Sequence, residues 1–484
     1  MRILISAGEA SGEMYGAQLI EALRRAVSSI SQPEPSGSIG PEAQVLSTPR
    51  SLPHAEATAP VEMTELSRVG GPSAEIRSAG RAGRPSPHES LNFFGVGGAR
   101  MRAAGCDTIV DTKDLAVVGI TEVISHLPRI YGCYRKLIAK ADKRRPDLAI
   151  VIDSPSFNWR VARRMHRRGI PVVYYVCPQF WAWRQGRVRL LRKYVDKALV
   201  IFPFEEKFYR DCGVDATFIG HPLASLPRPT VSRANYAAEH HLNSDKSWIT
   251  LMPGSRVTEV QKNLPGILES AARLGSAYEY LMPVAPTLDR GFLEREVSLT
   301  DSLQRQKGKP SGAKAPSLGA ACGTTKVVPF HETTHETKLG FIHLVPEALP
   351  ALAHSRAGII ASGTATVEAA LMGTPFVMVY RVTPLTYWLG RPRVKVPHFA
   401  MVNLIAGREV VPELVQHDFT AENVVAKLGQ ILPDGPARNE IIEGLTAVRD
   451  SLRGTSADGL QPAERAAAMI LRLVPHTGER RPGS

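Results

Sequence analysis

Residues 357–372 read AGIIASGTATVEAALM, an apolar run that leads through a small polar turn into a helical pattern. The run at 357–360 predicts a buried strand. The turn SGTAT at 362–366 supplies a flexible glycine and hydroxyl groups that can cap the next helix. Strand, tight turn and helix in this order form the repeating unit of doubly wound α/β sheets, which bind ligands where the strands end. This stretch therefore predicts an α/β fold with a ligand site at the turn.

The same unit recurs in two series along the chain. Apolar runs predict strands at Ile3–Ser6, Phe93–Val96, Leu148–Ile152, Val172–Val176 and Ala198–Phe202, and then at Trp248–Met252, Tyr278–Met282, Ala357–Ile360 and Phe376–Tyr380. Helical patterns lie between these runs and continue to Leu473. A chain of 484 residues is too long for one ordinary core. We therefore predict two doubly wound domains that face a cleft, residues 1–225 and 226–455, followed by a C-terminal helix and tail at 456–484.

Two segments have the composition of disordered insertions. Residues 28–90 contain nine of the 37 prolines and no aromatic residue, and residues from about 303 to 340 are similarly rich in small and polar side chains. Such segments bury too little apolar surface to offset their ordering entropy. The second contains HETTH at 331–335, which matches the HExxH zinc signature. Because this motif follows Pro329 and contains two threonines, a stable helix is not expected there, and we predict no metal site.

Charge and cysteine content restrict the class of protein. The net charge is +13, and residues 129–197 hold 18 Lys/Arg against 4 Asp/Glu. This basic region predicts contact with phospholipid or a phosphorylated substrate, unless it only solvates helix faces. Because no nucleic-acid-binding module is recognisable, nucleic acid is not the favoured partner. The five cysteines are scattered without a CxxC pair, which favours a reducing cytoplasm over a disulfide or zinc framework.

An apolar segment precedes part of the basic region. Residues 115–131 are more apolar than a surface helix requires, and six Lys/Arg follow between positions 135 and 145. This order fits peripheral attachment to an anionic membrane or a pocket for acyl chains, although a buried helix beside a solvated one gives the same pattern. The N-terminus lacks the features of a signal peptide, and no run of about 18 apolar residues predicts a membrane span.

Two turns of the second domain have the residues of a diphosphate site. PGSR at 253–256 and SGTAT at 362–366 each join a predicted strand to a helical pattern. A helix N-terminus presents free N–H groups and a positive dipole end to an anion. Either turn alone is equally well explained as a helix cap, but two in one domain favour nucleotide binding. The candidate contacts are Arg256, Ser362, Gly363 and Thr364 for phosphate and Glu368 for ribose hydroxyls.

The first domain supplies candidate acid and base groups. GEASGE at 8–13 follows the first predicted strand, and its carboxylates, Glu9 among them, suit hydroxyl-rich ligands or proton transfer better than phosphate. Asp153 follows another strand and is our candidate general base, with capping of the next helix as the alternative. Trp181 and Trp183 fit either a sugar or acyl pocket or ordinary core packing.

Nine short motifs follow one another along the chain in an order that is typical of one family. They are AGEASG (7–12), GVGGARM (95–101), VGITEV (118–123), IDSPSFN (152–158), WAWR (181–184), FIGHP (218–222), LMPGSR (251–256), ASGTAT (361–366) and NLIAGRE (403–409). Together they resemble bacterial lipid-A-disaccharide synthase. The resemblance covers almost the whole chain except the two insertions and the last few residues.

The resemblance implies a fold and a reaction. The fold is the glycosyltransferase-B type, with two Rossmann-like domains, in an enzyme that is peripheral on the cytoplasmic face of the inner membrane. The reaction is an inverting transfer from UDP-2,3-diacylglucosamine to 2,3-diacylglucosamine 1-phosphate, which gives the β-1,6-linked lipid A disaccharide and UDP. It implies no cofactor and no metal. The oligomeric state is left open, with a homodimer as one expectation.

The resemblance also implies roles for individual residues. Asp153 matches the family's base, and Arg256 its phosphate contact. The remaining matches are Glu9 in the N-terminal turn, Ser362, Thr364 and Glu368 in the donor-binding turn, and Asn403 and Gln416 at polar cleft positions. This chain has Glu13 and Ser156 where the family usually has Asp. The sequence therefore leaves open how far the Glu13 carboxylate extends into the site, and Asp153 lacks the second acid that could assist it.

Two alternatives remain. One is another UDP-N-acetylglucosamine transferase or epimerase of the same fold, and an epimerase would need no lipid-facing surface. The other is a nucleic-acid-binding protein, which only the basic region favours. Activity toward unacylated UDP-N-acetylglucosamine, or tight RNA binding without vesicle binding, would distinguish them.

Overall fold

The computed structural model describes residues 1–30, 91–115, 122–183, 185–307, 342–383, 387–388, 396–454 and 459–473. Most of the two expected insertions lies outside the described residues, as do the HETTH motif, the first half of the 115–131 apolar segment and Arg184. The described ends of both insertions are helical, because α1 continues to Ile30 and α10 to Lys307.

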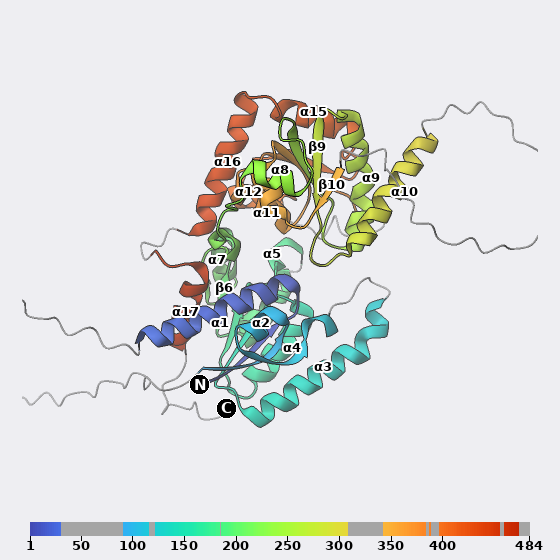
Figure 1. Ribbon diagram of the computed structural model, residues 1–484. Coiled ribbons are helices and arrows are strands. Elements are labelled where there is room, and N and C mark those ends of the chain that lie inside the picture. The colour runs from blue at the N-terminus through green and yellow to red at the C-terminus, as the bar shows by residue number, and fades with distance from the viewer. Residues whose placement is uncertain are drawn as a thin grey trace, which may run out of the picture.

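The N-terminal half of the chain forms a seven-stranded parallel sheet in the order β3-β2-β1-β4-β5-β6-β7 (Figure 1). Its strands are β1 Arg2–Ala7, β2 Asn92–Gly97, β3 Cys106–Asp111, β4 Leu148–Ile152, β5 Val172–Tyr175, β6 Lys197–Val200 and β7 Ala216–Phe218. The helix α1 (Ala10–Ile30) packs on one face, and α3 (Glu122–Arg144), α4 (Pro155–His166) and α6 (Val188–Tyr194) pack on the other. The shorter helices are α2 Ala99–Ala103, α5 Phe180–Trp183 and α7 Pro203–Asp211.

The C-terminal half forms a six-stranded parallel sheet in the order β10-β9-β8-β11-β12-β13. Its strands are β8 Ser247–Met252, β9 Tyr278–Pro283, β10 Ile342–Val345, β11 Ala357–Ala361, β12 Phe376–Tyr380 and β13 Glu413–Val415. One face carries α9 (Val257–Leu274) and α15 (Ala421–Ile431), and the other carries α8 (Arg233–Glu239), α11 (Ala348–His354) and α12 (Thr364–Met372). The remaining helices are α10 Arg290–Lys307, α14 Met401–Ala406 and α16 Pro436–Arg453.

The chain connects the two halves twice. The 3₁₀ turn Pro222–Ser225 leads from the first half to the second, and the end of α16 leads back to α17 (Pro462–Leu473), which lies beside α1 (Figure 1). The two connecting segments contact each other, because the His221 N–H donates a hydrogen bond to the Leu452 carbonyl at 2.8 Å. Buried Arg465 also donates to the Ile219 carbonyl at 3.2 Å.

All nine predicted strands are present, and the four strands that the sequence patterns missed are the edges of the two sheets: β3, β7, β10 and β13. The interior strands are almost continuously buried, as parallel strands covered on both faces must be. The edges are only partly buried, so they carry polar residues and give no continuous apolar run.

Pro265 lies inside a helix, although a proline there usually interrupts one. The helix α9 runs from Val257 to Leu274 with Pro265 inside it. Proline removes one backbone hydrogen bond from a helix interior. The buried apolar side of α9, which includes Val260, Leu264 and Ile267, packs into the core of the second half and outweighs that loss. Among the described helices, none is both long and apolar enough to cross a membrane.

Candidate active site

The candidate residues lie at corresponding places in the two sheets. In the first sheet β1 lies between β2 and β4, and in the second sheet β8 lies between β9 and β11. The direction in which the chain adds strands therefore reverses between β1 and β4 and between β8 and β11. Ligands bind at this switch point in doubly wound sheets. The loops after these four strands hold Glu9, Asp153, Arg256 and the turn 362–366.

The turn after β4 holds Asp153 in an unusual backbone conformation. Asp153 and Ser154 both have φ of 45°, in the left-handed region that residues with a Cβ rarely occupy. Ser154 is the N-cap residue of α4, and Asp153 precedes it. Capping of the helix, the alternative role for Asp153, is therefore not what the side chain does.

Two buried donors hold the carbonyl of Asp153. Asn158 Nδ2 donates to it at 2.9 Å, and the Tyr174 hydroxyl donates at 2.8 Å. Asn158 is fully buried, and it also bonds the carbonyls of Ile152 (2.8 Å) and Ser6 (3.1 Å). The Ser6 hydroxyl donates back to Asn158 Oδ1 at 2.7 Å. This network joins the ends of β1 and β4 beneath the candidate base.

The carboxyl group of Asp153 has a raised pKa. Burial is the main cause, and the negative charge of Glu9 adds to it, so the pKa rises to about 6. The Ser154 N–H and the positive charge of Arg256 act in the opposite direction. The residues from both halves of the chain are thus within electrostatic reach of one another. A carboxylate that titrates near pH 6 is ionised at neutral pH and can still accept a proton well.

The loop after β1 comes close to the Asp153 turn. A Cβ on Gly8 would lie 2.3 Å from Ser154 Oγ, so only glycine fits at this approach. Glu9 follows and is exposed. Glu13 is engaged elsewhere, since its carboxylate accepts the Arg100 N–H at 2.8 Å at the start of α2.

The loop after β8 presents Arg256 at the start of α9. Gly254 has φ of 132°, and a Cβ there would clash with Glu259. Arg256 Nη1 bonds Glu259 Oε1 at 2.9 Å, and 68% of the Arg256 side chain is exposed. Glu259 Oε2 also accepts the Ser255 N–H at 3.1 Å. The guanidinium group is therefore oriented at the helix N-terminus but remains accessible to a ligand.

The turn after β11 is held by its backbone and by Ser362. Gly363 is the N-cap residue of α12, with φ of 141°, and nothing lies within 4 Å of a Cβ built on it. Ser362 Oγ donates to the Phe399 carbonyl at 2.8 Å, so this hydroxyl can only accept from a ligand. Thr364 is exposed at the first position of the helix. Its N–H belongs to the helix end that lacks internal acceptors, which suits an anion.

Glu368, one turn further along α12, lies near the first half of the chain. Burial raises its pKa to about 7. Burial likewise raises the pKa of Tyr15 in α1 well above its usual value, with further contributions from the charges of Glu368 and Asp153. Tyr15 is therefore within reach of one carboxyl group from each half.

Asn403 and Gln416 brace the backbone. Asn403 is fully buried, and its amide makes four bonds: it donates to the Val411 carbonyl and to Glu413 Oε1, and it accepts from the Val410 and Val411 N–H groups. Gln416, with φ of 55°, accepts the Val382 N–H at 2.8 Å. Asn403 has no polar group left for a ligand, so the structure does not bring it to the cleft position that was expected.

Trp181 belongs to the core. It is buried, and its indole N–H donates to Glu205 Oε1 at 2.9 Å. Glu205 is fully buried and also accepts the N–H groups of Ile201 and Phe202. Of the two interpretations, core packing is confirmed for Trp181.

Sequence reasoning missed three residues that shape these turns: Asn158, Tyr174 and Glu413. Glu413 accepts the Phe399 and Ala400 N–H groups at 2.8 and 2.9 Å and so fixes the segment that receives the Ser362 hydroxyl. Of the three, only Asn158 could have been found from the sequence, because it is a polar residue on an otherwise apolar helix face. Among the described residues, no group of three His, Cys, Asp or Glu is placed to hold a metal ion.

Comparison with known proteins identifies close relatives. A family model described as lipid-A-disaccharide synthetase matches residues 73–313 and 325–453. A lipid-A-disaccharide synthase of Koribacter versatilis is 43% identical over 98% of this chain and 99% of its own length. Another, of Acidobacterium capsulatum, is 41% identical over 97% of this chain and 96% of its own length.

Solved structures with the same fold are more distant in sequence. A glycotransferase of kitacinnamycin superposes with a TM-score of 0.53 at 14% identity, over 98% of this chain and 99% of that one. A UDP-GlcNAc 2-epimerase from Neisseria meningitidis, bound to UDP-GlcNAc, gives 0.53 at 11% identity, also over 98% and 99%. These likenesses and the two parallel sheets confirm the expected glycosyltransferase-B fold.

Proposed function

The chain belongs to the lipid-A-disaccharide synthase family of hexosyltransferases, and we propose that within this activity Asp153 is the general base, while Arg256 and the turn 362–366 hold the donor diphosphate. The proposed donor is UDP-2,3-diacylglucosamine, and the proposed acceptor is 2,3-diacylglucosamine 1-phosphate. The observation that supports the proposal is that Asp153, from the first half of the chain, lies near enough to Arg256, from the second, for the positive charge of Arg256 to lower its pKa.

The proposed step is a single inverting displacement. The 6-hydroxyl oxygen of the acceptor forms a bond to the anomeric carbon of the donor while the bond from that carbon to the diphosphate oxygen breaks. UDP leaves with the electron pair, and the hydroxyl proton passes to Asp153. With a pKa of about 6, Asp153 is mostly ionised at pH 7 and is well matched to this transfer.

The second half of the chain stabilises the leaving group. Negative charge builds up on the diphosphate as the bond breaks, so donors that face it bind the transition state more tightly than the ground state. Arg256 can leave Glu259 and fork onto the diphosphate, because its side chain is largely exposed. The N-terminus of α12 at Thr364 adds free N–H groups and its dipole. Glu368 would bind the ribose hydroxyls.

A product assay tests this assignment. Purified protein with both diacylated substrates should release UDP and form a disaccharide in equal amounts, and Asp153→Asn should form neither at a comparable rate. UDP release that requires no acceptor, or conversion of unacylated UDP-N-acetylglucosamine into its epimer, would instead favour the alternative of a sugar-nucleotide epimerase with the same fold.

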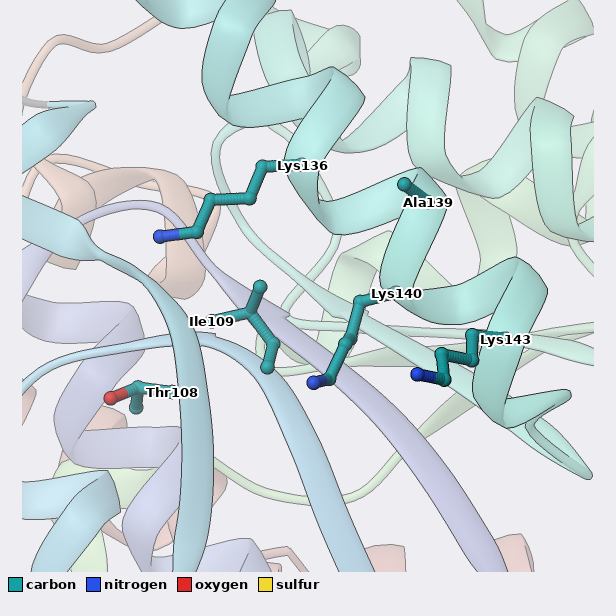
Figure 2. Close-up of a pocket in the computed structure, with 6 residues that line it drawn as sticks. All are labelled: Thr108, Ile109, Lys136, Ala139, Lys140 and Lys143. Atoms are coloured by element: carbon teal, nitrogen blue, oxygen red, sulfur yellow. The ribbon is translucent and has the colours of Figure 1, made fainter.

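We also propose that the basic face of the first half attaches the enzyme to an anionic membrane. Figure 2 shows Lys136 and Lys140 of α3 extending over the edge strand β3, with Lys143 beside them, around an open depression of about 500 Å³. Thr108 and Ile109 of β3 and Ala139 of α3 complete its lining. Along the same helix, the apolar side chains of Leu127 and Tyr131 are 52% and 62% exposed.

The three lysines have no acidic partner among the described residues. Nearby arginines are neutralised, as in Arg129 with Asp114 at 2.5 Å, Arg102 with Asp111 at 2.8 Å, and Arg144 with Asp107. Unpaired ammonium groups around one depression attract anionic headgroups, and this attraction weakens with salt.

Vesicle binding tests the membrane proposal. Vesicles with anionic phospholipid should bind the protein in low salt and release it in high salt, and vesicles of neutral phospholipid should not bind it. Lys140→Glu should weaken this binding more than Lys262→Glu, which makes the same charge change at an exposed position in α9 of the other half. Equal loss in the two variants would assign the attraction to net charge and not to this face.

A further inference from the structure

We propose that Tyr174 and Asn158 are positioning residues, which hold the Asp153 carbonyl so that the strained turn directs the Asp153 carboxylate toward the acceptor. The inference depends on the proposed role of Asp153 as the base. Neither residue was a candidate from the sequence, and both side chains are buried.

The backbone conformation of the turn requires support. Asp153 and Ser154 are consecutive residues with φ of 45°, and each bears a Cβ that this region disfavours. Such a conformation persists only where the surrounding structure fixes it, and it occurs disproportionately at functional sites. The direction of the Asp153 carbonyl sets the peptide plane between these two residues, so a group that fixes this carbonyl fixes the turn.

The two donors reach that carbonyl from different elements. The Tyr174 hydroxyl comes from β5, next to β4 in the sheet, at 2.8 Å, and Asn158 Nδ2 comes from α4 at 2.9 Å. Tyr174 is 1% exposed and Asn158 is 0% exposed. Water therefore cannot replace either donor easily, and loss of one leaves the carbonyl held from a single side.

Asn158 also ties this turn to the loop that carries Glu9. Its amide bonds the Ser6 carbonyl and accepts the Ser6 hydroxyl, and Ser6 stands near the end of β1. The same side chain thus fixes the distance between the two loops of the first-half switch point. Gly8, which leaves room for Ser154, completes the arrangement.

The neighbouring residue Tyr175 provides a matched control. It lies on the same strand, it is fully buried like Tyr174, and its hydroxyl has no hydrogen-bond partner among the described residues. Removal of either hydroxyl changes the core by one oxygen atom. Only the Tyr174 hydroxyl contacts the Asp153 turn in the network described above.

The experiment compares Tyr174→Phe with Tyr175→Phe in the full-length enzyme. Loss of one buried hydrogen bond to the turn should lower kcat by about tenfold in Tyr174→Phe, with both KM values within about twofold of wild type. Tyr175→Phe should leave kcat within about twofold of wild type. Asn158→Leu removes the bonds to the Asp153, Ile152 and Ser6 carbonyls together and should cost more, about 100-fold or beyond, where the variant folds.

The pH profile separates positioning from a purely structural role. Asp153 owes its raised pKa mainly to burial, so a turn that relaxes into water should lower that pKa and move the acid limb of kcat to lower pH. A variant that is merely less stable would lose active enzyme without moving this limb.

The outcomes decide between the two assignments. Equal kcat values in Tyr174→Phe and Tyr175→Phe, or a lower kcat in Tyr174→Phe with an unmoved acid limb, would overturn the positioning role while Asp153→Asn remained inactive. Activity in Asp153→Asn would overturn the base itself, whatever the tyrosine variants did.

Discussion

The turns after β4 and β11 occupy equivalent positions in the two sheets, yet they are built in opposite ways. The first places Asp153 and Ser154, both with side chains, in the left-handed region and holds them with two buried donors. The second uses Gly363, which adopts a positive φ without steric cost, and keeps its N-terminal helix backbone open.

The difference fits the role that we propose for each turn. A general base has to present one carboxylate in one direction, so rigidity from buried side chains is useful. An anion cradle needs backbone N–H groups near the ligand, so the absence of a side chain is useful. We therefore expect damage to the first turn to affect turnover and damage to the second to affect donor binding.

The largest effect should come from Asp153→Asn. The amide keeps the shape of the side chain but cannot accept the acceptor's proton, so kcat should fall by about 1,000-fold. The affinity for UDP, measured by calorimetry on the same preparation, should stay within about twofold because the diphosphate contacts lie on the other half. Near-normal turnover would remove Asp153 from its role.

Arg256→Gln should weaken donor binding and also lower kcat, because its contact with the diphosphate strengthens as the leaving group gains charge. Loss of a charged contact to the diphosphate should raise the KM for the donor by about tenfold or more. Lys262→Gln, a change at an exposed position further along α9, is the matched control and should leave the donor KM unchanged. Equal donor KM values in the two variants would contradict the phosphate role of Arg256.

The pH dependence of turnover should follow Asp153. Its pKa is raised from the ordinary value to about 6, and only the ionised form accepts a proton. The kcat/KM, which reports ionisation of the free enzyme, should thus reach a plateau above about pH 7 and fall by about fivefold between pH 6 and pH 5. An acid limb near pH 4 would show that the buried carboxyl group is not the one that limits the reaction.

The smallest effect on chemistry should come from Asn403, which affects stability. Asn403→Leu removes three bonds to the backbone of Val410 and Val411 and one to the Glu413 carboxylate, and should lower the free energy of unfolding by about 2–3 kcal/mol. Asn423→Ala, on the surface of α15, should cost less than about 1 kcal/mol by the same urea titration. An equal loss in both variants would contradict the bracing role.

The fold was predictable where burial dominates. Interior strands such as Leu148–Ile152 and Ala357–Ala361 are buried throughout, and an apolar run reports that directly. An edge strand such as Cys106–Asp111 is only partly buried and carries Asp and Thr, so its sequence resembles that of a loop. The helix α9 continues through Pro265 because tertiary packing outweighs the local preference of proline.

The site was predictable only for residues next to a strand end. Glu9, Asp153 and Arg256 could be placed because the carboxyl ends of parallel strands meet at one edge of a sheet. Tyr174 and Asn403 could not, since their roles depend on contacts between elements distant in sequence. A polar side chain in a motif gives no sign of whether it faces a ligand or braces the backbone.

The most direct test makes the same substitution at both turns. A Cβ on Gly8 would strike Ser154 and displace the Asp153 turn, whereas a Cβ on Gly363 meets nothing but strains φ of 141° in the phosphate turn. Gly8→Ala should lower kcat by about tenfold or more with UDP affinity unchanged, and Gly363→Ala should weaken UDP by about tenfold. Weaker UDP binding in Gly8→Ala, or unchanged UDP binding in Gly363→Ala, would contradict the division of roles between the two turns.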